Sequence, residues 1–225
     1  MPTEAAPRIG RQPYSQQVEA ALAGSDGQLA MDAVYAMERC ESMDRLTEST
    51  FKQRDNTSDP KRRAAYALIA EEFQREQRSC QSLSESHKSR RNDLLKIANA
   101  KGVKGAGLRY LSQPADIIES DPEAKRNAVR NIQADARAGD RNSIILLGIE
   151  GENYQLPPET RWAFTAAATW IQRNDGASIA QVDDLMLTAF QLASMPADAP
   201  ADVVQRVNAT TKQLVDAYLA NRKKP

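Results

Sequence analysis

Hydrophobic residues recur along this chain every three or four positions, with polar and charged residues between them. Two long segments show the pattern most clearly. The first has apolar positions at Ala30, Ala33, Met37, Cys40 and Met43, and the second at Tyr66, Ile69, Phe73, Cys80 and Leu83. This spacing places the apolar side chains on one face of an α-helix. Because no segment alternates apolar and polar residues as a half-buried strand does, the pattern predicts an all-α protein with no sheet.

Turn-forming residues divide the periodic segments into separate helices. We expect helices over about 16–23, 28–52, 60–100 with a break near 82–86, 106–112, 122–137, 143–148, 158–173, 179–194 and 201–222, with an irregular stretch between Pro114 and Pro122. Asp59 is suited to cap a helix that begins at Pro60. On that helix, Glu71, Glu72, Arg75 and Glu76 are expected on the solvated face. Short connections make successive helices antiparallel, so we expect helical hairpins.

Composition divides the chain into three regions. Residues 1–15 contain three prolines and one glycine and are expected to form a flexible leader. Residues 16–100 are expected to form a long helical hairpin region, and residues 101–225 a second helical region of the same domain. A chain of 225 residues is long enough to bury a core.

The second region contains an internal period. Gly102, Gly139 and Gly176 each follow the end of a predicted helix and lie 37 residues apart. A glycine there can adopt the left-handed conformation that closes a helix, and a small residue three or four positions later lets the next helix approach closely. Repeated helix–turn–helix units of this kind bury their apolar faces by stacking on one another.

A family resemblance rests on these turns. The residues that carry it are Ala138-Gly139-Asp140, Ser143, Leu147-Gly148, Gly151, Trp162 and Ala166-Ala167-Ala168. Together they resemble Sel1-like repeats, relatives of the tetratricopeptide repeats, over about residues 94–176. The resemblance implies an irregular α-solenoid of stacked hairpins. A helical bundle whose turns contain glycine is the alternative, since the first copy has Leu111-Ser112 in place of Leu147-Gly148 and the third lacks the pair.

The two cysteines lie at equal distances from the turn between the long helices. Cys40 and Cys80 are each 20 residues from Pro60, so an antiparallel hairpin brings them to the same height. We therefore predict a disulfide between them, with two buried free thiols as the alternative. Such a bond would stabilise the fold by about 3–4 kcal/mol in the chain-entropy model. A disulfide persists in an oxidising compartment such as the periplasm, so we expect the protein to be periplasmic. In that case its signal peptide has been removed. A cytoplasmic location is the alternative.

Charge and hydropathy exclude two classes of partner. The 30 basic residues balance the 30 acidic ones, whereas proteins that neutralise phosphates usually carry a basic excess, so we expect no nucleic-acid partner. No run approaches 18 consecutive apolar residues, so we expect no membrane span, although association with the envelope remains compatible with the sequence.

The sequence offers little catalytic chemistry. His87 is the sole histidine and lies in a polar stretch, and Glu71-Glu72 and Asp183-Asp184 are adjacent carboxylates that diverge on a helix. We expect these to be surface residues. We also expect no metal site and no cofactor, because multi-histidine sites, a Cys-x-x-Cys motif and phosphate-binding loops are all missing.

These observations favour a non-enzymatic helical scaffold of the periplasm or cell envelope that binds a protein or peptide. The candidate partner-binding residues are Arg109, Tyr110, Tyr154, Arg161 and Trp162, since exposed aromatic and arginine side chains often anchor peptides. At least one of Trp162 and Trp170 is expected in the core. One alternative is an envelope enzyme acting on cell-wall glycan, which requires a deep cleft with a buried carboxylate. Another is a cytosolic adaptor or secreted effector with reduced cysteines.

Overall fold

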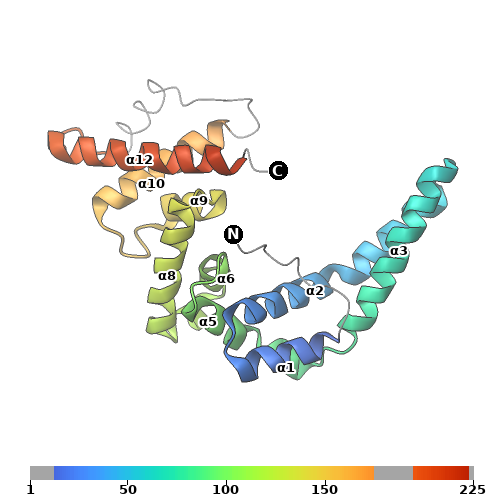
Figure 1. The fold of residues 1–225 in the computed structure, drawn as a ribbon. Coiled ribbons are helices and arrows are strands. Elements are labelled where there is room, and N and C mark those ends of the chain that lie inside the picture. Colours follow the sequence, from blue (N-terminus) through green and yellow to red (C-terminus); the bar gives the residue numbers. More distant parts are fainter. Residues whose placement is uncertain (1–12, 175–194, 223–225) are drawn as a thin grey trace. The chain divides into compact units, whose positions relative to one another are not determined.

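Helical hairpins make up the whole of the described structure. The computed structural model describes residues 13–174 and 195–222, and the helix predicted over 179–194 lies outside them. The described residues contain helices packed as adjacent hairpins and no strand, which confirms the predicted all-α class (Figure 1).

The helices fall into two compact units, residues 1–103 and residues 104–225. The first contains α1 (Tyr14–Gly24), α2 (Gly27–Asn56), α3 (Pro60–Cys80), α4 (Glu85–Ser89) and α5 (Arg91–Ala100). The second contains α6 (Ala106–Leu111), α7 (Ala115–Glu119), α8 (Pro122–Arg137), α9 (Arg141–Glu150), α10 (Pro158–Asn174) and α12 (Ala201–Arg222). The division falls close to the boundary expected at residue 100. That both regions belong to one domain stays a prediction.

Capping side chains set the start of several helices, namely α2, α3, α4, α8 and α9. The side chain of Asp59 accepts a hydrogen bond from the backbone N–H of Lys61, and Pro60 begins α3, as predicted. The expected break near 82–86 separates α3 from α4. One helix was not predicted, the five-residue α7 that follows Pro114. It is too short to show a helical period.

The core of the first unit surrounds the first half of α2, which packs against both α1 and α5. This half contributes buried side chains on more than one side, namely Ala30, Met31, Ala33, Val34, Ala36 and Met37. Tyr14, Val18 and Ala21 of α1 and Leu94, Leu95 and Ala98 of α5 complete this core. The small alanine side chains let the three helices approach closely.

The core of the second unit lies among α8, α9, α10 and α12. Ile132 of α8, Ile144 of α9, Phe164 and Trp170 of α10, and Leu214 and Val215 of α12 are all buried. The burial of Trp170 agrees with the expectation that at least one tryptophan lies in the core. Gly148 of α9 contacts α10 so closely that an added Cβ would lie 2.8 Å from the carbonyl oxygen of Phe164.

Two glycines close their helices as predicted. Gly102 and Gly139 have φ angles of 67° and 85°, in the left-handed region. After each, the next backbone N–H reaches back five residues, from Val103 to the oxygen of Ala98 and from Asp140 to that of Asp135. These are the bonds of the Schellman motif. The third turn, at Gly176, lies outside the described residues.

Substituting Gly139 tests how strictly its turn is packed. A Cβ there would meet the backbone of Ala217 and lie 2.7 Å from the nitrogen of Tyr218, at a φ that disfavours other residues. We expect Gly139→Ala to lower the free energy of unfolding by about 2–4 kcal/mol in urea titrations followed by circular dichroism. Gly24→Ala is the control, because nothing lies within 4 Å of its added Cβ. Equal stability of the two variants would contradict the close packing.

Candidate functional site

A disulfide joins the two long helices of the first unit. The Cα atoms of Cys40 and Cys80 lie 5.5 Å apart, and their sulfur atoms are at bonding distance. This confirms that the two residues face each other across the α2–α3 hairpin, at the height predicted from the sequence. The loop that the bond closes spans 40 residues.

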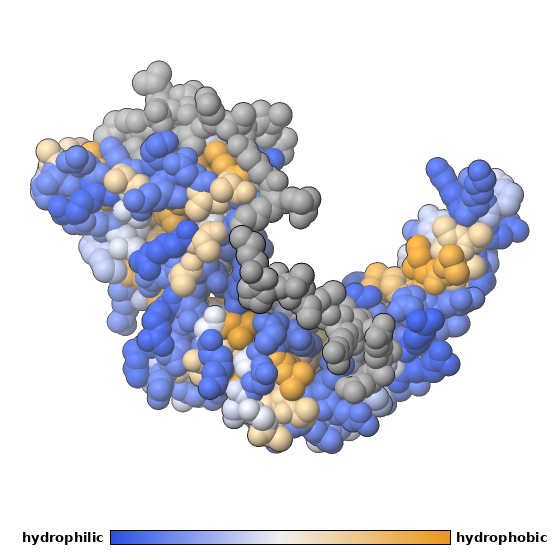
Figure 2. Space-filling view, viewed as in Figure 1, coloured by the Kyte–Doolittle hydropathy of each residue, from blue (hydrophilic) through white to orange (hydrophobic). Residues whose placement is uncertain are grey.

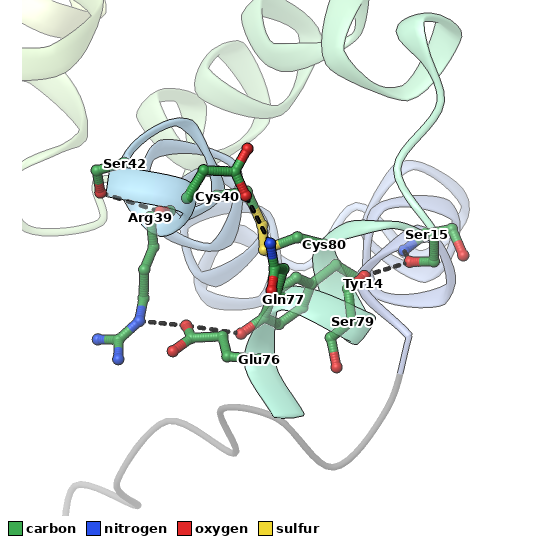
Figure 3. Close-up of a disulfide and its surroundings, with 11 residues drawn as sticks. Tyr14, Ser15, Arg39, Cys40, Ser42, Glu76, Gln77, Ser79 and Cys80 are labelled. Atoms are coloured by element: carbon green, nitrogen blue, oxygen red, sulfur yellow. Dashed lines mark hydrogen bonds and ion pairs between the residues drawn. A yellow bond between two sulfur atoms is a disulfide. The ribbon is translucent and has the colours of Figure 1, made fainter. Parts of the chain in front are cut away.

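A polar cluster around one buried carboxyl group lies beside the disulfide, and we call it the base cluster (Figure 3). It consists of Glu76 on α3, Arg39 on α2 and Tyr14 on α1. The Tyr14 hydroxyl donates a hydrogen bond of 3.1 Å to Oε1 of Glu76, and the Arg39 guanidinium forms an ion pair with the same oxygen. Only 2% of Glu76 is exposed, so its charge is held by these two partners rather than by water.

The base cluster also fixes α1 to the end of α3. The backbone N–H of Ser15 donates to the Ser82 hydroxyl over 3.1 Å, and that hydroxyl donates to the carbonyl oxygen of Ser79. Burial of the Tyr14 ring, reinforced by the Glu76 carboxylate, raises the pKa of its hydroxyl well above the ordinary value for tyrosine. The hydroxyl therefore stays protonated and can donate to the carboxylate.

The expectation that Glu76 lies on the solvated face of its helix is wrong. Glu76 precedes Cys80 by one helical turn, and Arg39 is adjacent to Cys40, so both lie near the covalent contact between the helices. The sequence feature that could have predicted this ion pair is an acidic and a basic residue close to two cysteines that face each other. No nearby residue in the sequence indicates that Tyr14, which lies 62 residues from Glu76, takes part in the cluster.

Beyond the disulfide, α2 and α3 continue together as a two-helix hairpin, residues 41–79, which we call the arm (Figure 1). Within it, α3 packs mainly on α2. We call the contact between α2 and α3 in the arm the seam. Its buried residues are small or polar for the most part: Met43, Thr47, Thr50 and Ala70. The Gln77 amide adds a hydrogen bond of 2.7 Å to Oδ1 of Asp44. The seam alone therefore buries little apolar surface.

Large apolar side chains remain exposed on the arm. The exposed fractions are 39% for Leu46, 69% for Leu68 and 43% for Ile69, and Figure 2 shows apolar surface there. The predicted apolar stripe on α3 is thus only partly buried, since Tyr66 and Phe73 are also partly accessible. The physical reason is that a two-helix hairpin covers one side of each helix. No third helix of the described residues packs on the remaining apolar positions to any extent.

The candidate partner-binding residues of the second unit do not form one exposed set. Tyr110 is completely buried, so its prediction as a surface anchor is wrong. It lies in the short helix α6, where Ala106, Gly107 and Leu111 are buried as well. Arg109, Tyr154, Arg161 and Trp162 are partly exposed. Arg109 lies on α6, which packs on α8, whereas Arg161 and Trp162 lie on α10, which packs on α9 and α12.

Three of these candidates lie near the connection between α9 and α10. A guanidinium nitrogen of Arg161 is 3.5 Å from a carboxylate oxygen of Glu152, and its Cγ lies 3.2 Å from where Gly151 would carry a Cβ. Burial, aided by the Glu150 carboxylate, raises the pKa of Tyr154. The ring of Tyr154 is thus partly enclosed. Its role in binding, like that of Arg109, Arg161 and Trp162, stays a prediction.

The single histidine caps a helix. The Ser84 hydroxyl lies 2.7 Å from Nδ1 of His87, the same nitrogen accepts the backbone N–H of Ser84 over 3.1 Å, and Nε2 lies 3.4 Å from a carboxylate oxygen of Glu19. A serine, a histidine and a glutamate therefore lie together. However, the serine backbone and side chain both contact Nδ1, as in the capping box at the start of α4. The arrangement explains the helix boundary without catalysis.

Most of the other described carboxylates occupy surface positions or ion pairs, whereas Asp135 of α8 is partly buried and accepts the backbone N–H of Gly105 over 2.9 Å. Glu71 and Glu72 are exposed, as expected, and Asp183-Asp184 lie outside the described residues. A depression beside α12 is lined in part by Glu159, Thr160 and Arg206. The Arg206 guanidinium lowers the pKa of Glu159 and Asp202 by hydrogen bonding to both. These two carboxylates are therefore held ionised, which does not suit a general acid.

The described residues contain neither a metal-ligating cluster nor a membrane-spanning helix. No three His, Cys, Asp or Glu side chains of residues 13–174 and 195–222 come together as metal ligands would. No helix within those ranges is long and apolar enough to cross a bilayer.

Comparisons with protein-family models, curated proteins and solved structures gave no match for this chain. The resemblance to Sel1-like repeats therefore stays a prediction. Two of its three turn glycines have the left-handed geometry that the resemblance implies.

Breaking the disulfide tests how far the arm depends on it. We expect the double variant Cys40→Ser/Cys80→Ser to unfold in urea with a free energy lower by about 4 kcal/mol, because the cross-link closes a 40-residue loop. Reductant should lower the stability of the wild type by a similar amount and leave the double variant unchanged. A wild-type protein whose unfolding curve is insensitive to reductant would contradict this role.

Alkaline pH tests the bond between Tyr14 and Glu76. The pKa of Tyr14 is raised in the folded protein, so its stabilising contribution is complete below the unfolded value of about 10 and decreases above it, where the unfolded chain alone releases the proton. We expect the wild type to lose about 1 kcal/mol more stability between pH 9 and pH 11 than Tyr14→Phe does. Urea unfolding at both pH values measures the difference. Parallel losses in the two proteins would show that the hydroxyl is not held in this way.

Proposed function

We propose that this protein is a non-enzymatic helical scaffold of an oxidising compartment, the periplasm or cell envelope, which binds a protein partner through the arm. The observation that carries this proposal is the exposure of Leu46, Leu68 and Ile69 on a hairpin that is fixed at its base. Burying one such side chain in an interface contributes roughly 1.5–3 kcal/mol.

The anchoring of the arm supports a role in binding. The disulfide and the base cluster hold α2, α3 and α1 together at one end of the hairpin. A hairpin held in this way loses less conformational entropy on binding than a free one, so more of the apolar contact energy appears as affinity. Recognition of helical faces of this kind is common between proteins.

The disulfide supports the proposed compartment. Such bonds persist in the periplasm and are rare among cytosolic proteins, where thiols are kept reduced. The pairing of Cys40 with Cys80 is therefore compatible with an envelope location.

The glycan-acting enzyme finds less support. Its acid would be a buried carboxylate at a cleft, and the buried carboxylate near the arm, Glu76, is engaged by Arg39 and Tyr14.

Site-specific photo-crosslinking tests the proposal. We expect a benzophenone amino acid at position 68 to give a crosslinked product of one defined mass in cells that produce the full chain. Mass spectrometry then identifies the captured protein, and the purified pair is tested for binding. Position 126 is the control, because Arg126 is exposed on α8, outside the arm.

The pattern of crosslinks decides the outcome. Leu46→Asp should abolish the product at position 68, since it places a charge within the apolar surface of the arm. Equal capture at positions 68 and 126, or no capture at either, would overturn the proposed role of the arm.

A further inference from the structure

Charged side chains are distributed unevenly along the arm. Its outer half, residues 50–69 around the turn, carries five basic side chains against two acidic ones, a net charge of +3. The basic residues are Lys52, Arg54, Lys61, Arg62 and Arg63. The acidic residues, Asp55 and Asp59, are engaged with Arg54 and with the start of α3 respectively.

The inner half of the arm, residues 41–49 and 70–79, has the opposite sign. Its exposed acidic residues are Glu41, Asp44, Glu48, Glu71 and Glu72, and its exposed basic residues are Arg45, Arg75 and Arg78. The exposed side chains thus give a net charge of −2. Glu76 does not count toward this surface because it is buried in the base cluster.

The exposed apolar residues lie close to where these two charged regions meet. The disulfide places Cys40 level with Cys80, and the bond from Gln77 to Asp44 keeps the same register further along. By this register Leu68 and Ile69 lie about level with Lys52 and Phe51, and Leu46 lies about one and a half turns closer to the disulfide. All three are therefore near the middle of the arm.

We propose that the arm binds the arm of a second copy of this chain, antiparallel and related by a two-fold axis through this apolar middle. This inference rests on the proposed function and names its partner. In this arrangement the basic outer half of each arm lies on the acidic inner half of the other, and the apolar side chains meet at the axis. A parallel arrangement places like charges together, which is unfavourable. The two hairpins then complete a four-helix bundle, and each copy contributes the same surface.

The size of the arm sets the strength of this dimer. Past the disulfide, 16 residues of α2 and 20 residues of α3 extend about 24 Å and about 30 Å, and two helices side by side present roughly 500 Å² per partner. The total of roughly 1,000 Å² is at the lower limit for specific interfaces. The dimer should therefore form reversibly in the micromolar range and weaken with salt, because its exposed charges are screened.

Charge reversal in the full chain tests the proposal. The outer variant is Lys61→Glu/Arg62→Glu, and the inner variant is Glu41→Lys/Asp44→Lys. All four side chains are exposed, and by the register above the two pairs lie on opposite sides of the apolar middle at about equal distances from it. Sedimentation velocity should show a wild-type dimer, and each variant alone should dimerise at least ten-fold more weakly. An equimolar mixture of the two variants should form a heterodimer, because each charged half then meets its opposite. The chain carrying all four changes should dimerise again.

Two controls separate this surface from others. Leu68→Asp should weaken the dimer at least ten-fold, whereas Ile149→Asp, at an exposed isoleucine on α9, should leave it unchanged. Circular dichroism confirms that each variant keeps its helical content. A wild type that remains monomeric at about 200 µM, far above the micromolar range expected from the interface area, overturns the dimer. Failure of the mixed variants to associate overturns the antiparallel arrangement.

The crosslinking result distinguishes the two proposals. If the wild type is monomeric but position 68 captures a different protein that binds when purified, the dimer is wrong and the arm still serves as a docking element. If the wild type is monomeric and position 68 captures nothing, both proposals fail. Self-crosslinking at position 68, together with rescue in the mixed variants, supports both.

Discussion

The arm depends on the joint between Cys40, Cys80 and the base cluster. Its own seam is made of threonine, alanine and one methionine, which bury little apolar surface beside the leucines and methionines of an ordinary helical core. Two helices of this composition would separate easily in water. The covalent bond and the buried carboxylate hold them together at one end, and the exposed side chains of the arm are thereby kept in a fixed arrangement. The arm therefore presents an already ordered surface to any partner that it binds.

The second unit is held together differently. Alanine and glycine let its helices approach closely, as where Gly148 contacts α10 and where an added Cβ at Gly107 of α6 would lie 2.6 Å from the carbonyl oxygen of Ala128 on α8. Both glycines belong to short helices that pack on longer ones. This is the part of the chain that carries the resemblance to helical repeats.

Features that depend on nearby residues could be predicted from the sequence. The equal distances of the cysteines from Pro60, the cap at Asp59 and the left-handed turns at Gly102 and Gly139 each follow from a few residues, and the structure agrees with all of them. Burial could not be predicted so well, because it depends on which elements meet. Periodicity places Ile69 on the apolar face of α3, but only a third helix could bury it. Tyrosine is a residue type that often anchors a partner at a surface, but Tyr110 is buried in α6, which packs against α8.

The hydrogen bond from Tyr14 links the beginning of α1 to the helix that carries Cys80. Proteolytic trimming that removed Tyr14 would leave Glu76 inside the protein with Arg39 and without its hydroxyl donor. A buried carboxylate that loses a donor is costly, and the simplest relief is for water to reach Glu76 beside the disulfide. A cut before α2 would thus loosen the contacts of Glu76, which lies 62 residues from Tyr14 in the sequence.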